Sequence, residues 1–91
     1  MSEISDLPML PTKQELHVWL TQVVADYLGN PPDALDPAKP LAEAGLDSVY
    51  ALSICGEIEE TLDVAVEPTL AWDHPSIDAI TDHLHGIIST R

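Results

Sequence analysis

Ser48 is the residue whose type and setting most suggest chemistry in this chain. It stands in the stretch Gly45-Leu46-Asp47-Ser48-Val49, with an acid before it and a long amphipathic run after it. A serine at such a place can act as a nucleophile, cap a helix or accept a group that another enzyme attaches. The four histidines and the single cysteine are the other candidates for nucleophilic or metal chemistry.

A hydrolase nucleophile at Ser48 is disfavoured by its neighbours. The nucleophile elbow of such enzymes has glycine two residues before and two residues after the serine, where this chain has Leu46 and Tyr50. The elbow also joins a strand of a parallel sheet to a helix, and this sequence predicts no such sheet. We therefore expect that Ser48 is not a hydrolase nucleophile.

The histidines and the cysteine do not form a metal-binding pattern. His83 and His85 are two residues apart, so on a helix they point to different sides. His74 precedes a proline in a turn, and His17 lies early in a helix, so we expect these histidines to be solvated or bonded locally. Cys55 has no second cysteine to pair with and lies among apolar helical residues, which predicts a small buried side chain.

The remaining possibilities for Ser48 are a structural one and a functional one. A phosphate attached to a serine on the first turn of a helix would meet free N–H groups and the positive end of the helix dipole. A serine at this place is, however, most often only a cap, and Asp47 is also a good N-cap candidate. From these residues alone, both interpretations stay open.

Apolar residues at helical spacing predict three long helices and one short one, which would position Ser48. Thr12–Glu15 forms a capping-box pattern, and Gly29–Pro32 ends the helix that follows it. A long connection over 29–46, with a turn of helix near Leu41–Ala44, leads to the second helix. We expect the four helices to begin at Thr12, at Asp47 or Ser48, at Pro68 and at Ser76. The predicted fold is all-α, a small four-helix bundle with a long loop between its first two helices.

The second helix has an expected buried stripe and an expected acidic face. The stripe that we predict consists of Val49, Leu52, Cys55, Ile58 and Leu62. The opposite face carries Glu57, Glu60 and Asp63. Gly56 inside this helix costs roughly 1 kcal/mol relative to alanine, which suggests a close approach of another helix there.

Charge and composition limit the possible partners. The 91 residues carry 16 acids and 3 basic residues, a net charge of -13, which disfavours nucleic acid and anionic membranes and favours partners with basic patches. With 45% hydrophobic residues the chain can form one domain. We expect a flexible leader over 1–11 and one domain over 12–91. No signal peptide or membrane span is predicted, so the expected place is the cytoplasm.

The stretch LAEAGLDSVYALSICGEIEETLDV resembles the centre of acyl carrier proteins and of the related peptidyl carrier domains. Their attachment motif is an acid followed by a serine, introduced by glycine and an apolar residue, as in Gly45–Ser48 here. The segment Pro68–Ile77 resembles the aromatic–Asp–His–Pro–Thr/Ser–Ile segment of polyketide-type carriers. Val49 and Tyr50 differ from the residues usual in carriers of fatty-acid synthesis. The likeness covers about residues 12–88 and is closest to the polyketide type.

This resemblance implies that a phosphopantetheinyl transferase attaches 4′-phosphopantetheine from coenzyme A to Ser48, with Asp47 as the acid of the motif. The thiol of the group would carry an acyl chain as a thioester, and the carrier, a monomer, would catalyse nothing. Partners would be a ketosynthase, an acyltransferase or an adenylating enzyme with basic docking patches. The expected contacts are Val49, Tyr50, Glu57 and Glu60. The alternatives are an aminoacyl or peptidyl carrier and an unmodified acidic helical adaptor.

Overall fold

Helix α1, Lys13–Leu28, begins at the predicted capping box in the computed structural model, which describes residues 11–90. Thr12 Oγ1 accepts a hydrogen bond from the Glu15 amide at 3.1 Å, and Glu15 Oε1 accepts one from the Thr12 amide at 2.8 Å. Gly29 ends the helix with φ 72°, a left-handed conformation that suits glycine. The leader predicted over 1–11 lies outside the described residues, apart from Pro11, which is buried.

The long connection after α1 is packed against the bundle. It contains two short 3₁₀ helices, η2 over Pro32–Ala34 and η3 over Leu41–Ala44, and the second confirms the predicted turn of helix. The Leu41 amide donates to the Pro75 carbonyl at 2.7 Å, and the Asp78 amide donates to the Pro37 carbonyl at 3.0 Å. These bonds tie the connection to the start of the last helix, so it holds a defined path toward Ser48.

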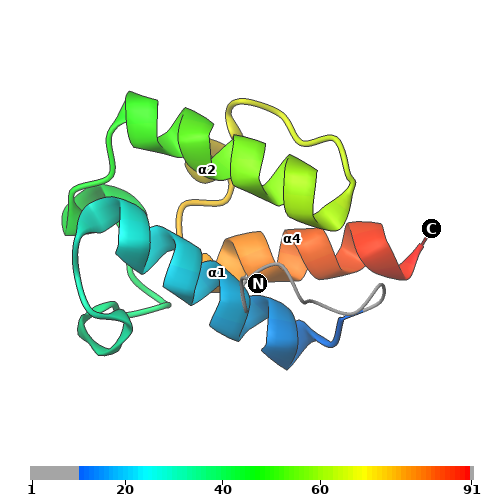
Figure 1. Cartoon of the computed structure of the whole chain (residues 1–91), viewed down its shortest axis with the longest axis horizontal. Helices are drawn as coiled ribbons and strands as arrows, with labels where there is room; N and C mark the ends of the chain where they lie inside the picture. Colours follow the sequence, from blue (N-terminus) through cyan, green and yellow to red (C-terminus); the bar gives the residue numbers. More distant parts are fainter. Residues whose placement is uncertain (1–10, 91) are drawn as a thin grey trace.

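Three further helices complete the bundle: α2 over Ser48–Leu62, α3 over Leu70–Asp73 and α4 over Ile77–Ser89. Helix α1 packs against both α2 and α4, as Figure 1 shows. Ser76 caps α4 by accepting a hydrogen bond from the Ala79 amide at 3.1 Å. The described residues contain no strand. The predicted all-α four-helix bundle, with three long helices and one short one, is therefore confirmed.

The core is aliphatic, as the scarcity of aromatic residues requires. Leu16 and Leu20 of α1, Ile58 of α2, and Ile80 and Leu84 of α4 are each fully buried. Each such side chain contributes about 1.5–3 kcal/mol when it leaves water. Helix α1 is therefore the central helix of the bundle, since it packs against the inner face of α2 and against α4 (Figure 1).

The predicted buried stripe of α2 is wrong at two positions. Val49 is 69% exposed and Leu52 is 55% exposed, whereas Ala51 and Ile54 are buried. Cys55, together with Ile58 and Leu62 further along, is buried as predicted. The face that meets α1 therefore begins at Ala51, and Val49 and Leu52 lie about 160° and about 100° around the helix from it. The prediction chose the bulkier apolar side chains, but the neighbouring helices select the face.

The predicted close approach at Gly56 is also wrong. This glycine is exposed, and a Cβ built on it would meet no heavy atom within 4 Å. Its backbone is helical, so alanine fits without strain. We expect Gly56→Ala to stabilise the fold by about 0.4–1 kcal/mol, because glycine loses more conformational freedom on folding. Urea unfolding measures this gain. A loss of stability would contradict the prediction and would mean that a side chain of a neighbouring helix packs against Gly56.

Candidate functional site

Ser48 is the first residue of α2, and the cap of that helix is its neighbour. The Asp47 side chain accepts a hydrogen bond from the Tyr50 amide at 2.9 Å, and the Asp47 carbonyl accepts one from the Ala51 amide at 2.9 Å. Ser48 is exposed, and its hydroxyl makes no hydrogen bond within the described residues. Asp47 therefore caps the helix, and the serine hydroxyl is free.

Two residues before Ser48, the left-handed Gly45 and the buried Leu46, place this serine at the surface. Gly45 ends η3 with φ 103°, a conformation that few other residues adopt. Leu46 is 6% exposed, and its amide donates to the Leu41 carbonyl at 3.1 Å. Because Leu46 is fixed in the core, the chain turns outward at Asp47 and presents Ser48 to solvent.

The start of α2 suits a phosphate on Ser48. The amides of Ser48 and Val49 make no hydrogen bond within the described residues, and the first turn of the helix holds no acid. Free amides and the helix dipole at such a place favour an anion. The residues present therefore fit a phosphodiester at Ser48 Oγ, with Asp47 on the flank as the cap.

The four predicted contact residues do not share one open face. Val49 and Glu60 point outward, and Glu60 is exposed. Tyr50 is 38% exposed and turns toward α1, where its ring lies 6.2 Å from that of Tyr27. Glu57 also faces α1 and accepts a long hydrogen bond of 3.5 Å from the Tyr27 hydroxyl. Val49 and Glu60 therefore lie on the outward face of α2, whereas Tyr50 and Glu57 lie on its flank.

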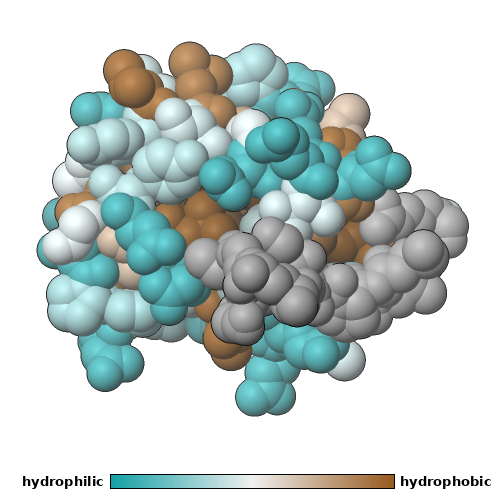
Figure 2. Space-filling view, viewed as in Figure 1, coloured by the Kyte–Doolittle hydropathy of each residue, from teal (hydrophilic) through white to brown (hydrophobic). Residues whose placement is uncertain are grey.

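Leu52 is a surface residue that the sequence reasoning missed, because its apolar character placed it in the predicted core. It follows Val49 by three positions, so the two side chains stand together on the outward face just after Ser48. Figure 2 shows hydrophobic side chains protruding at the edge of the molecule that α2 forms in Figure 1. We name Val49 and Leu52 the apolar pair.

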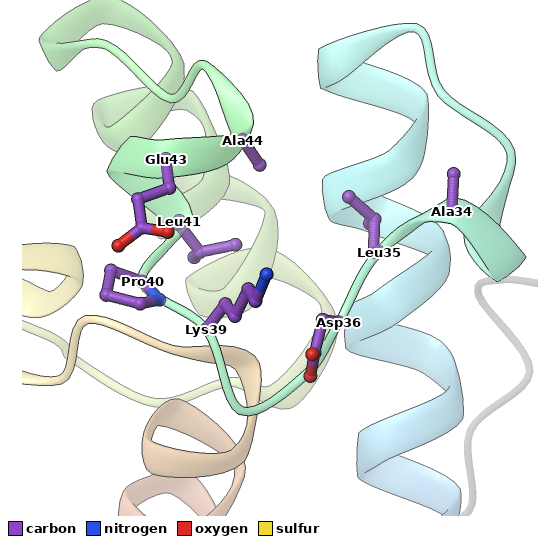
Figure 3. A pocket seen from close by; sticks show the side chains of 8 residues that line it. All are labelled: Ala34, Leu35, Asp36, Lys39, Pro40, Leu41, Glu43 and Ala44. Carbon is purple, nitrogen blue, oxygen red and sulfur yellow. The ribbon is translucent and has the colours of Figure 1, made fainter.

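The long connection carries a cavity of about 220 Å³. In Figure 3 the Lys39 side chain extends between Leu41 and Leu35, and the Glu43 carboxylate lies on the far side of Leu41. Lys39 has no ion pair within the described residues. Ser48 does not line this cavity, so the serine hydroxyl stands outside it.

Three of the four histidines and the cysteine contact other residues. His17 Nε2 lies 2.8 Å from Asp78 Oδ1, and the rings of His74 and His83 stack with centroids 4.1 Å apart at 20°. Nothing in the sequence indicated this stacking. Cys55 is buried as predicted, and burial raises the pKa of its thiol. Among the described residues no group of three or more histidine, cysteine or acidic side chains could hold a metal ion.

The stacked histidines predict a dependence of stability on pH. Burial, and then the charge of His74, lower the pKa of His83 below 6.5, against a smaller opposing effect of Asp73. The unfolded chain therefore takes up the proton first, so stability that is present above about pH 6.5 is lost as the pH falls toward the folded pKa. We therefore expect the free energy of unfolding, measured with urea, to fall less for His83→Gln than for the wild type when the pH is lowered from about 7.5 to about 5.5. His85→Gln is the control, and an equal pH dependence for wild type and His83→Gln would contradict the prediction.

Comparisons with known proteins agree on one family. The family described as "Phosphopantetheine attachment site" matches residues 18–84. A phenolphthiocerol/phthiocerol polyketide synthase of Mycobacterium tuberculosis is 36% identical over 70 residues, which is 77% of this chain but 4% of the synthase. The chain thus spans a small part of the curated relatives that it matches.

Two solved structures have the same arrangement of helices. The acyl carrier protein LipD from Actinoplanes friuliensis is 46% identical, with a TM-score of 0.76, over 100% of this chain and 98% of that one. A free-standing peptidyl carrier protein from Acinetobacter baumannii is 33% identical, with a TM-score of 0.81, over 84% of this chain and 95% of that one. Among the described residues, no helix has the length and apolar character needed to cross a membrane.

Proposed function

The chain belongs to the phosphopantetheine attachment site family, whose members are non-catalytic carriers of 4′-phosphopantetheine, and from that premise we propose that Ser48 holds the group and that the cargo is a polyketide-type acyl chain. The observation that most supports Ser48 as the attachment site is that its hydroxyl is free. It is exposed on the first turn of α2 while Asp47 performs the capping.

Each residue around Ser48 has a defined part in this proposal. Within the transferase, Ser48 Oγ would attack the pantetheine-side phosphorus of coenzyme A and pass its proton to a base of the transferase. The oxygen would become the ester oxygen of a phosphodiester, and adenosine 3′,5′-bisphosphate would leave. The free amides of Ser48 and Val49 at the start of α2 would stabilise the resulting negative charge. Asp47 and Leu46 fix the start of the helix, so the serine keeps its exposed position. The attached group supplies a terminal thiol for thioester formation.

Likeness over the whole chain supports an acyl cargo. The carrier that matches 100% of this chain at 46% identity is an acyl carrier protein, and the mycobacterial relative is a polyketide synthase. The competing proposal is an aminoacyl or peptidyl cargo, which the Acinetobacter peptidyl carrier supports at 33% identity. The unmodified adaptor is set aside, because this family carries phosphopantetheine.

A loading experiment separates the two kinds of cargo. The chain is first converted with coenzyme A and a broad-specificity phosphopantetheinyl transferase. It is then offered to acyltransferases and acyl-activating adenylating enzymes in one series, and to amino-acid-activating enzymes in another. Intact mass should show acyl thioesters that hydroxylamine removes. Loading by amino-acid-activating enzymes alone would replace the acyl proposal with the peptidyl one.

We further propose that the partners dock on α2 through basic patches. These partners are the phosphopantetheinyl transferase and a ketosynthase, an acyltransferase or an adenylating enzyme. Val49 and Leu52 offer apolar contact beside Ser48, and Glu60 offers charge on the same outward face. Tyr50 and Glu57 border this face on the side of α1.

Docking driven by this charge should depend on salt. With a net charge of -13, encounter with a basic surface is accelerated at low ionic strength. Raising the salt from about 0.1 M to about 1 M shortens the screening length from about 10 Å to about 3 Å. We expect the association rate with the transferase, measured by stopped flow, to fall about tenfold or more. An unchanged rate would assign docking to the apolar pair instead.

A further inference from the structure

A second surface feature lies between α1 and α2, away from Ser48. It is a cavity of about 200 Å³ lined by Val23, Asp26, Tyr27 and Glu57. Tyr50 and Glu57 are seven residues apart, so they lie on one side of α2, about 10 Å from each other along the helix. Both meet Tyr27, which connects the cavity to the flank of α2.

The walls of this cavity are apolar and aromatic. Val23 is buried and Tyr27 is half-buried. The Tyr50 ring lies 6.2 Å from the Tyr27 ring at an angle of 46°, within the range of favourable aromatic pairs. The Tyr50 ring therefore packs beside the Tyr27 ring, and Tyr27 gives the cavity an aromatic surface.

The acidic groups at the cavity are two carboxylates. Asp26 accepts a hydrogen bond from Gln22 Nε2 at 2.9 Å, which steadies its position. Glu57 accepts only the long bond of 3.5 Å from the Tyr27 hydroxyl. Neither acid has an ion pair within the described residues. Burial, and then the charge of Glu57, raise the pKa of Tyr27, so the phenol stays neutral and the negative charge belongs to the two acids.

The size of the cavity limits its occupant. Ligand pockets for small molecules measure about 300–1,000 Å³, and a water molecule takes about 30 Å³. A cavity of about 200 Å³ therefore corresponds to several waters, or to one long side chain. Two carboxylates beside an aromatic ring suit a planar cation with several donors. A guanidinium has five N–H donors and stacks on aromatic rings, whereas an ammonium is a compact, strongly hydrated charge.

We infer that this cavity is a receptor for one arginine side chain of a partner protein. The guanidinium lies against the Tyr27 ring and donates hydrogen bonds to the Asp26 and Glu57 carboxylates. The site differs from the outward face of α2, because it draws Asp26 and Tyr27 from α1. It adds a directional contact to the charge attraction, and it fixes how a partner is rotated about α2. The inference does not depend on which residue carries the phosphopantetheine.

The test uses the full chain and two blocked tripeptides, Gly-Arg-Gly and Gly-Lys-Gly, followed by ¹H–¹³C NMR. We expect the arginine peptide to shift the Val23 methyl and Tyr27 ring signals in a saturable way. The lysine peptide should bind roughly two- to fivefold more weakly, as the loss of stacking on an aromatic face implies. Equal affinity of the two peptides would overturn the inference, since it would show only general attraction.

Matched variants localise the binding. Asp26→Asn is an exposed change that should weaken the arginine peptide about threefold, and the double variant Asp26→Asn/Glu57→Gln should weaken it further. Tyr27→Phe keeps the ring and should retain binding. Asp33→Asn removes an equal charge from η2 and is the control, so an equal loss there would overturn the inference. Transferase modification, measured on the same variants, tests the proposed carrier function separately.

Discussion

Replacement of Ser48 with alanine is expected to abolish phosphopantetheine attachment completely while leaving the fold intact. The alanine removes only a hydroxyl that is exposed and makes no hydrogen bond within the described residues, and the Asp47 cap remains. Changes at such surface positions usually alter stability by less than about 0.5 kcal/mol. Intact mass after incubation with coenzyme A and the transferase should therefore show the added group on the wild type and none on Ser48→Ala.

The matched control is Ser53→Ala, which removes a hydroxyl from the same helix. Ser53 is half-buried and lies more than one turn from Ser48. This variant should be modified as fully as the wild type. Circular dichroism of both variants shows whether they fold. A folded Ser48→Ala protein that still gains the mass would move the attachment site to another residue.

Replacement of Ile58 with alanine is expected to cause the largest loss of stability among changes in α2. The side chain is fully buried where the inner face of α2 meets the core. Truncation of a buried isoleucine to alanine costs about 2–5 kcal/mol, because it removes apolar contacts and leaves a cavity. A domain of this size has only about 5–15 kcal/mol in total. Urea unfolding should show a large shift of the midpoint.

The control for this loss is Leu52→Ala on the outward face of the same helix, about 120° around it from Ile58. Leu52 is 55% exposed, so its truncation should change the free energy of unfolding by less than about 0.5 kcal/mol. This pair also tests which face of α2 is buried. If Leu52→Ala were as destabilising as Ile58→Ala, the face predicted from the sequence would be right and the observed one wrong.

The helix starts could be predicted from the sequence, because each depends on hydrogen bonds between residues close together in the chain. Thr12 and Glu15 cap each other across three residues, and Asp47 and Ser76 cap their helices in the same local way. The face of α2 could not be predicted to the residue, because Val49 and Leu52 are more apolar than Ala51. The packing of α2 against α1 and α3 leaves the small Ala51 buried and the larger side chains exposed.

In the candidate site, too, the local features could be predicted and the contacts between elements could not. The Asp47–Ser48 pair is a local motif, and its position at the start of a helix followed from the sequence. The pairing of Tyr27 with Tyr50, and of His74 with His83, joins residues on different elements. Such contacts depend on how the helices cross, which spacing along one helix does not reveal. Glu57 was therefore predicted as a partner contact on the acidic face of the second helix, without its neighbour Tyr27 on α1.

The most direct test of the central claim is to locate the attached group on the wild-type chain. The protein is co-expressed with a phosphopantetheinyl transferase, digested and analysed by tandem mass spectrometry. We predict the phosphopantetheine on the peptide that contains Ser48, with fragment ions that assign it to that serine. Assignment of the group to Ser53, Ser76 or Ser89, with Ser48 unmodified, would contradict the claim.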